Sequence, residues 1–176
     1  PKKLDWIQAE YIRSMSDAEF ADEVMVPELH EAGLIPGGVE YDEAWIDALA
    51  AIVKPRTKFP ADVVTVAAPV FATAETLEFD EKSVAKGLAK EGMGAVLDAA
   101  REALAALPAD GWTPEAIDGA LEPLSDALDL KKRVVFQAVR VAECGNMVSP
   151  PLGETMALIG RDDCLARIDR ARALAL

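Results

Sequence analysis

Cysteine and histidine are scarce in this chain of 176 residues, which contains two of the first and one of the second. Cys144 and Cys164 have neither a CxxC partner nor a neighbouring histidine, so they support neither a disulfide framework nor a zinc site. We expect two reduced thiols in or near helices. His30 follows a helix that Pro27 interrupts, a setting that favours a structural role over a catalytic one.

Long apolar runs are also missing. No stretch has transmembrane length, we expect no signal peptide, and the sequence contains no glycine-rich phosphate loop. The carboxylates are scattered over the expected helices, and no pair reads as a general acid–base site. We therefore expect no catalytic residue, metal or cofactor here, no membrane partner and a cytoplasmic location. Because the sequence begins with Pro1 and not with methionine, we expect it to be part of a longer protein.

The chain is poor in positive charge: it contains 18 Lys and Arg but 31 Asp and Glu, which gives a net charge of −13. The deficit is uneven: residues 1–130 hold 10 cationic and 26 acidic residues, whereas residues 131–176 hold 8 and 5. Phosphate binding depends on local patches and not on total charge. A nucleic-acid contact is therefore expected only over a limited face, and the acidic remainder would repel non-specific nucleic acid.

Helical signals dominate what is present. Hydrophobic residues make up 51% of the chain and recur at helical spacing, whereas β-rich pieces such as residues 63–66 are short and lie in helical contexts. The length suffices for one large domain or two small ones. The sequence predicts an all-α fold with two consecutive helical subdomains, residues 16–72 and 73–176, after a separate segment at 1–15.

Caps and breakers set the expected helix ends. Ser16 and Glu19 form a capping box, and the helix that they start must bend near Pro27. Pro55 ends a later helix, and Thr113 begins another. The expected helices cover residues 3–14, 16–29, 42–53, 61–67, 80–90, an alanine-rich stretch up to 107, 113–128 with a kink at Pro123, 131–144, a helix that halts at Gly160, and 161–171, with a loop at 36–38.

The first candidate site is the turn KPRTKFP at residues 54–60, which places Lys54, Arg56 and Lys58 between two helices. The planar guanidinium of arginine can make two parallel hydrogen bonds to the edge of a base, so Arg56 is the candidate reader. The two lysines are candidate phosphate contacts. The alternative is that these are solvated cations near a helix end, where positive charge suits the helix dipole.

The second candidate site is a turn between two helices. The helix that carries Arg140 is stopped by Gly145, and Ser149 is expected as the N-cap of the next helix, with two prolines in its first turn. A rigid turn with one hydroxyl, apolar surfaces and a nearby arginine suits single-stranded bases, which splay out and form hydrogen bonds along their exposed edges. In the alternative, Ser149 only caps a helix, and Arg140 pairs with Glu143 or Glu122.

Two further groups of cations lie near the C-terminal end. Lys131, Lys132 and Arg133 open the helix that carries Arg140 and could grip phosphate, although positive charge there opposes the helix dipole. Solvated surface is the alternative. Most arginines of the final helix are expected in surface ion pairs with interleaved aspartates. They are Arg161, Arg167, Arg170 and Arg172.

The order of an arginine, a glycine, a Ser-Pro turn and a leucine-rich helix within residues 136–160 resembles the C-terminal anticodon-binding region of bacterial glutamyl-tRNA synthetases. The resemblance extends across nearly the whole chain. It implies the α-helical anticodon-binding fold of this synthetase class, with residues 1–15 as the tail of a stem-contact region. Three other motifs carry it: KLDW at 3–6 with Tyr11 and Ile12, LKKR at 130–133, and RDDCLARIDRA at 161–171.

The resemblance also implies a partner and roles for residues. The partner is glutamate tRNA, bound by a monomeric enzyme. Arg56 would read the third anticodon base, as in members that discriminate against glutamine tRNA. The full-length enzyme would attach glutamate to tRNA with ATP and Mg²⁺, through an N-terminal half that is absent here. The residues expected around the wobble and middle bases are Arg140, Met147, Ser149, Pro150 and Leu152, with polar contacts from Ser149 and from the N–H of Leu152.

Four positions depart from the family's pattern. Gly153 stands where many members have phenylalanine, and Glu122 stands where some have an anticodon-contacting arginine. Gln8 and Ala9 replace the usual Asn-Gly. These departures weaken the expected contacts at the wobble base. The alternative function is a helical protein–protein interaction module without a nucleic-acid role.

Overall fold

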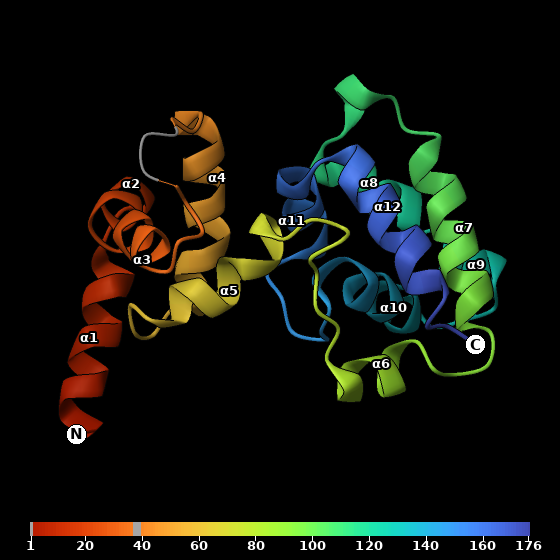
Figure 1. The fold of residues 1–176 in the computed structure, drawn as a ribbon, viewed down its shortest axis with the longest axis horizontal. Helices are drawn as coiled ribbons and strands as arrows, with labels where there is room; N and C mark the ends of the chain where they lie inside the picture. The colour runs from red at the N-terminus through yellow and green to blue at the C-terminus, as the bar shows by residue number, and fades with distance from the viewer. Residues whose placement is uncertain (1, 37–39) are drawn as a thin grey trace. The chain divides into compact units, whose positions relative to one another are not determined.

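The computed structural model describes residues 2–36 and 40–176, with side chains from Trp6 onward. Helices account for the regular structure, and no strand occurs in the described ranges, so the all-α prediction is confirmed (Figure 1). The chain divides into two compact units, Pro1–Phe71 and Ala72–Leu176. Within the described residues, no helix is both long and apolar enough to cross a membrane.

The first unit follows the predicted helix ends closely. Its helices are α1 (Lys2–Ser14), α2 (Asp17–Phe20), a π-helical turn (Ala21–Met25), α3 (Val26–Glu31), α4 (Glu43–Val53), a 3₁₀ turn (Lys54–Arg56) and α5 (Asp62–Phe71). The predicted loop at 36–38 falls partly on Gly37 and Gly38, which lie outside the described residues.

The start of α2 confirms the capping box. The Ser16 hydroxyl accepts a hydrogen bond from the N–H of Glu19 at 3.1 Å, and the Glu19 carboxylate accepts one from the N–H of Ser16 at 2.7 Å. These bonds to Ser16 lower the pKa of Glu19. The predicted bend takes the form of the π-helical turn directly before α3. Pro27 has no N–H to donate to the carbonyl one turn earlier, and its ring crowds that carbonyl. The wider π-helical turn accommodates the missing hydrogen bond and relieves the steric crowding.

One helix of the first unit is longer than predicted. We expected it to end near residue 67, but α5 continues to Phe71 with Pro69 inside its last turns. Phe71 packs edge-on to Trp45 at a ring distance of 5.7 Å, and Trp45 stacks on Tyr41 at 5.4 Å. This aromatic contact extends the helix beyond the point that local signals indicate. The core of the first unit includes Phe20, Met25, Leu29, Leu49, Val53, Val63 and Ala67.

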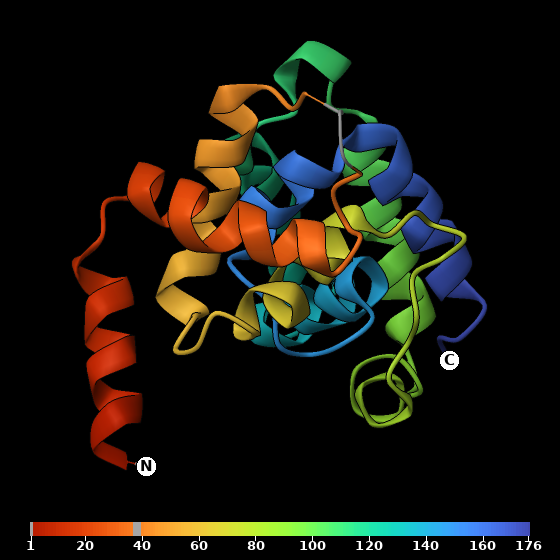
Figure 2. The same ribbon diagram turned by 60° about the vertical axis from the view of Figure 1, so that its left-hand side comes forward.

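The second unit packs around α10. Figures 1 and 2 both show α7 and α12 side by side, and each of them also contacts α10. The core includes Leu97 and Leu104 of α7, Val135 and Val139 of α10, and Ile168 of α12. The elements are α6 (Glu81–Gly87), α7 (Met93–Ala105), a 3₁₀ turn (Ala109–Gly111), α8 (Pro114–Leu121), α9 (Leu124–Ala127), α10 (Lys132–Cys144), α11 (Leu152–Ile159) and α12 (Arg161–Arg172).

The arginines of α12 confirm a prediction only in part. We expected surface ion pairs with the interleaved aspartates, and two form: Arg161 pairs with Asp162 at 3.3 Å, and Arg167 pairs with Asp163 at 2.7 Å although the Arg167 side chain is fully buried. Arg172 pairs instead with Asp98 of α7 at 2.8 Å. The other three donate to backbone carbonyls of the second unit. Arg161 bonds Ala105 and Leu107, Arg170 bonds Ala74 and Leu77, and Arg167 bonds Glu143 and Ala72. The guanidinium carries five donors, so one side chain can satisfy several carbonyls of irregular backbone.

Candidate nucleic-acid interface

The turn after α4 is held by its own side chains. Asp62 accepts hydrogen bonds from the N–H groups of Lys58 and Phe59, both at 2.9 Å. The hydroxyl of buried Thr57 donates to the Val53 carbonyl at 3.0 Å. The backbone on both sides of Arg56 is therefore fixed before any ligand binds. Sequence reasoning missed the role of Asp62, although a short acidic side chain after a turn is a recognised local bonding pattern.

The three cations of this turn are in different situations. Lys54 donates to the Met15 carbonyl at 2.8 Å and pairs with Asp17 at 2.7 Å, and its side chain is 18% exposed. Arg56 and Lys58 are exposed and have no hydrogen bond or ion pair from their side chains to any described residue. Lys54 thus ties the turn to the start of α2, whereas Arg56 and Lys58 present open cationic groups. The phosphate contact predicted for Lys54 depends on its one remaining N–H.

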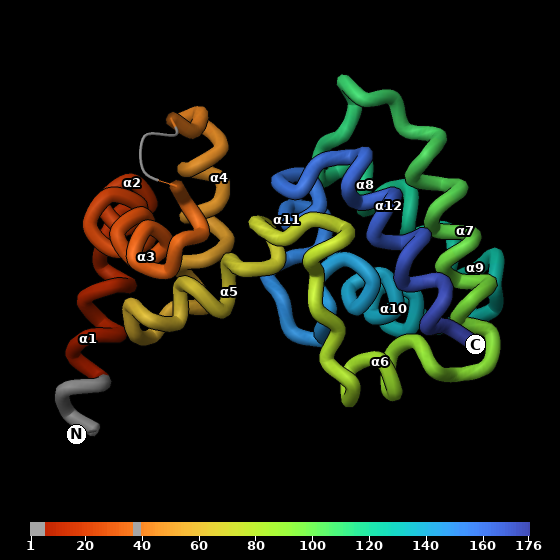
Figure 3. The backbone as a smooth tube through the Cα atoms, in the orientation of Figure 1, coloured from red at the N-terminus to blue at the C-terminus, as the bar shows by residue number. Residues whose placement is uncertain are grey.

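The turn between α10 and α11 is tied to the start of α6. In Figure 3 the chain between α10 and α11 passes the segment that leads into α6, and the N–H of Asp80 donates to the Gly145 carbonyl at 2.8 Å. The N–H of Met147 donates to the Ser83 hydroxyl at 3.2 Å. The Asn146 side chain accepts from the N–H of Val148 at 2.8 Å. Gly145 stops α10 as predicted, with φ of +73°.

Arg140 and Ser149 are brought together in this turn. The Nε of Arg140 donates to the Ser149 hydroxyl at 2.8 Å, and that hydroxyl donates to the Pro150 carbonyl at 2.8 Å. The alternative pairing of Arg140 with Glu143 or Glu122 is not what the structure shows. The hydroxyl of Ser149 is therefore oriented by the protein, and no described residue accepts a hydrogen bond from the outer N–H groups of Arg140.

The expected cap of α11 was wrong. Ser149 does not cap the helix, and the two prolines do not form its first turn. The helix begins at Leu152 with Pro151 at the capping position and no side-chain cap. Because a residue before proline is pushed out of the α region, Pro151 keeps Pro150 out of the helix, and Ser149 therefore cannot be its N-cap.

The residues predicted to surround the bases differ in how far their side chains are exposed to solvent. Pro150 is buried, Met147 and Ser149 are half-buried, and Leu152 is 3% exposed. The side chain of Leu152 thus belongs to the core, and its predicted contact would fall to its N–H group. Val148, which sequence reasoning missed, is 83% exposed at the tip of the turn. An apolar residue between a helix stop and a Ser-Pro pair was the available signal.

The cations at the start of α10 are all exposed. The ammonium of Lys132 pairs with Glu122 and lies 5.2 Å from the centre of the Phe136 ring. The side chains of Lys131 and Arg133 make no hydrogen bond or ion pair with the described part of the chain. Glu122 therefore neutralises one of the three predicted phosphate contacts, and the other two stay open.

The close packing of α8 against α11 explains why residue 153 is a glycine. A Cβ at this position would lie 2.8 Å from both the Asp118 carboxylate and the Pro114 carbonyl oxygen of α8. Contacts this short with backbone do not occur in proteins, so a larger side chain would force α8 and α11 apart. The missing phenylalanine follows from this close approach of two helices.

A buried carboxyl lies directly before the second turn. Glu143 is fully buried, and neither carboxyl oxygen has a hydrogen-bond partner among the described residues. Burial raises its pKa to about 8, and the Asp163 carboxylate adds to the rise, while the Cys164 thiol and the Arg167 guanidinium partly lower it. Both cysteines are free and buried, and burial raises the pKa of Cys144 to about 11. Glu143 is therefore neutral at pH 7, which avoids an uncompensated charge in the core.

Stability of the second unit should consequently fall as pH rises. The pKa of Glu143 is higher in the folded state than its ordinary value of 4.5, so the folded state binds more protons between pH 4.5 and about 8. Its contribution is fully present below pH 4.5 and declines by roughly 1 kcal/mol per pH unit through that window. Urea unfolding of wild type and Glu143→Gln from pH 5 to 8 isolates the contribution of Glu143, because the other titrating groups contribute equally to the free energy of unfolding of both proteins. Parallel stability curves would contradict the prediction.

Comparisons with known proteins give this geometry a context. Residues 19–172 match a family model described as an anticodon binding domain. Glutamate–tRNA ligase of Myxococcus xanthus is 34% identical over 171 residues, which is 97% of this chain and 34% of that protein. The enzyme of the same name from Acidothermus cellulolyticus is 38% identical over 175 residues, with 98% and 34% covered.

Solved structures agree on the fold. The crystal structure of a glutamate tRNA ligase from Elizabethkingia meningosepticum in complex with its amino acid matches with a TM-score of 0.82 at 23% identity. The match covers 98% of this chain and 32% of that one. The chain thus spans about a third of the length of the curated relatives that it matches.

Proposed function

Because the chain belongs to the family of anticodon-binding domains, we propose that it recognises the anticodon loop of glutamate tRNA as the C-terminal part of a longer glutamate–tRNA ligase. The observation that carries this proposal is the likeness to curated glutamate–tRNA ligases over almost the whole chain, 97% and 98% in two of them. The open cations on rigid turns supply the chemistry that an RNA loop requires.

Two turns share the work in this proposal. Arg56 reads the third anticodon base from the turn after α4, with Lys58 at the phosphate backbone. Arg140, Met147, Ser149, Pro150 and the N–H of Leu152 surround the other two bases in the second unit. Lys131 and Arg133 add phosphate contacts. The preorganised hydrogen bonds of both turns limit the ordering cost of binding.

The ligase as a whole would attach glutamate to its tRNA with ATP and Mg²⁺, as a monomer in the cytoplasm. We assign that chemistry to the remainder of the ligase. In the described ranges, no group of three or more His, Cys, Asp or Glu is placed to hold a metal ion. The role of residues 1–176 is recognition: they hold the anticodon so that the catalytic part receives the correct acceptor end.

Arg56→Ala tests the recognition role. The substitution should cost about 1–3 kcal/mol of discrimination at the third anticodon base, because a bidentate contact to a base edge is lost. Affinity is measured for glutamate tRNA transcripts in which each anticodon base is varied, at low and moderate salt. Lys58→Ala is the matched control from the same turn, and it should weaken all transcripts alike and reduce the salt dependence.

Two outcomes would count against the proposal. Unchanged preference for the third base in Arg56→Ala, with the fold intact, would remove Arg56 from its role. No binding of tRNA at low salt by the full-length ligase would favour a helical protein–protein interaction module instead.

A further inference from the structure

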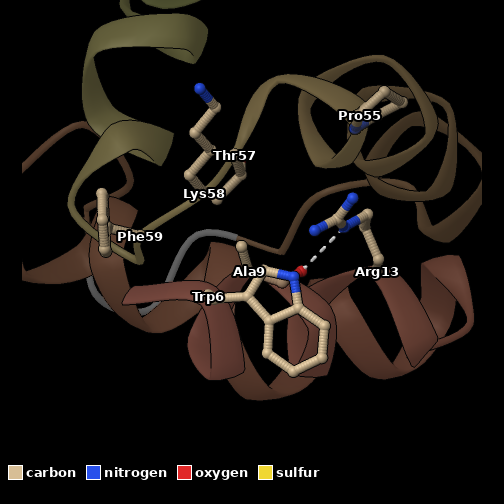
Figure 4. Close-up of a pocket in the computed structure, with 7 residues that line it drawn as sticks. All are labelled: Trp6, Ala9, Arg13, Pro55, Thr57, Lys58 and Phe59. Atoms are coloured by element: carbon tan, nitrogen blue, oxygen red, sulfur yellow. Dashed lines mark hydrogen bonds between the residues drawn. The ribbon is translucent and has the colours of Figure 1, made fainter. Parts of the chain in front are cut away.

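A pocket of about 320 Å³ lies in the first unit between α1 and the turn that follows α4 (Figure 4). Its two walls come from different elements, and the second wall is the turn that carries Arg56. Trp6, Ala9 and Arg13 line the pocket from α1, at a spacing that places them on one face of the helix. Pro55, Thr57, Lys58 and Phe59 line it from the turn.

The aromatic side chains of this pocket are open to solvent. The indole of Trp6 is 62% exposed and the ring of Phe59 is 37% exposed. Trp6 makes no ring contact within the described residues, whereas half-buried Trp45 stacks on Tyr41 inside the unit. An indole that is mostly exposed offers a large apolar face, and such faces stack on unpaired bases of single-stranded RNA.

Cations gather at the same pocket although the unit is acidic. Residues 1–71 contain six Lys or Arg against 13 Asp or Glu. Arg13 and Lys58 line the pocket, and Arg56 lies between two lining residues in the sequence. Arg13 pairs with Glu10 at 2.7 Å and its Nε donates to the Ala9 carbonyl at 3.2 Å (Figure 4), whereas the Lys58 ammonium is uncommitted among the residues described. A local positive site on an acidic background directs a phosphate to one place.

We propose that this pocket holds one unstacked nucleotide of the anticodon loop, adjacent to the base that Arg56 reads. Its base stacks on the indole of Trp6, and its phosphate faces Lys58 and Arg13. The volume lies at the lower end of the range of about 300–1,000 Å³ for small-molecule sites, which suits one nucleotide. The bonds from Asp62 fix the wall that carries Lys58 and Phe59. The inference rests on the proposed function and adds a binding subsite to it.

The test compares two exposed aromatic residues of α1 in the full-length ligase. Tyr11 is 60% exposed and does not line the pocket, so Tyr11→Ala is the matched control for Trp6→Ala. Trp6→Ala should weaken binding of glutamate tRNA about 5- to 150-fold, the equivalent of about 1–3 kcal/mol for one stacked base. Its preference for the third anticodon base should not change. Trp6→Phe should retain most of the affinity, and Tyr11→Ala should match wild type.

Abasic substitutions identify the bound nucleotide. Glutamate tRNA is prepared with the base removed at one position of the anticodon loop at a time. At the position that fills the pocket, base removal should weaken binding to wild type but not to Trp6→Ala, because the same contact is lost in both. Lys58→Gln should lower the salt dependence of binding by about one phosphate contact, and Trp6→Ala should leave it unchanged.

The outcomes separate this inference from the proposed function. Equal affinities of Trp6→Ala and Tyr11→Ala, in proteins that still prefer the third base, overturn the inference and leave the proposed function standing. A wild type without anticodon preference overturns the proposed function, and the inference with it. A Trp6→Ala protein that melts at a lower temperature but binds tRNA normally would show that the pocket is a packing surface for another part of the ligase.

Discussion

Gly145→Ala should remove about 4 kcal/mol or more from the free energy of unfolding of the second unit, an unusually large effect for one methyl group. Gly145 has φ of +73°, and a Cβ there would lie 1.9 Å from the backbone carbonyl oxygen of Glu78. A backbone atom cannot rotate away as a side chain can. The clash must therefore displace the segment that leads into α6, together with the hydrogen bond from Asp80 to Gly145.

A second glycine of the same unit separates the two causes of this loss. Gly92 has φ of +86°, but a Cβ there would meet nothing within 4 Å. Gly92→Ala should cost only the strain of the left-handed conformation, about 1–2 kcal/mol. Urea unfolding, with hydrogen exchange in α10 as the local probe, compares the two variants. Equal losses of unfolding free energy in the two variants would mean that the clash with Glu78 does not contribute to the destabilisation.

Gly145→Ala should also disturb the second candidate site, the turn between α10 and α11. Gly145 begins the turn that carries Met147 and Ser149, and Ser83 holds that turn through the N–H of Met147. When the start of α6 is displaced, the bond between Arg140 and Ser149 loses its fixed geometry. Gly145→Ala should therefore also weaken tRNA binding under conditions in which the unit remains folded, whereas Gly92→Ala should not.

Helix ends were predictable because the groups that set them act within one turn. The Ser16–Glu19 capping box, the Asp42 cap of α4 and the Thr113 cap of α8 all bond three residues ahead, so the sequence displays both partners. The stop at Gly145 follows the same logic. Two ends did not follow it. The end of α5 at Phe71 was decided by aromatic packing against Trp45, and α6 ends at Gly87, where we expected a helix up to residue 90.

The sites were predictable only in part, for the same reason. The turn at 54–60 showed three equivalent cations, and the difference between Lys54 and Arg56 arises from the Met15 carbonyl, 39 residues earlier. Arg140 and Ser149 were placed at the same turn, but the hydrogen bond between them was not predicted, and Ser149 was given the role of a cap. The family resemblance supplied what the pattern lacked, namely an expectation of which turn residues would contact a ligand, and that expectation stays a prediction.

Arg167 is the second position where a large effect is expected. Its side chain is fully buried, its Nε donates to Asp163 at 2.7 Å, and its other groups donate to the carbonyls of Glu143 and Ala72. Arg167→Met keeps the approximate length of the side chain and removes every donor. Asp163 loses its ion pair and keeps, among the described residues, only the hydrogen bond from the N–H of Ala74, and two carbonyls lose the donor that Arg167 supplies. The loss should be about 3–5 kcal/mol of stability in the second unit.

Arg172→Met is the matched control, because Arg172 lies on the same helix and forms the same kind of ion pair, with Asp98 at 2.8 Å. Its side chain is 45% exposed, so the loss should stay below about 1 kcal/mol. Arg167→Lys should fall between the two, since one ammonium cannot match the fixed fork that reaches three acceptors. Urea unfolding with hydrogen exchange in α12 measures all three variants.

A loss of stability in Arg167→Met no greater than that in Arg172→Met would show that burial does not increase the contribution of Arg167 to stability. The expected large loss would instead identify it as the residue that fixes the last turn of α10, directly before the turn that holds Ser149.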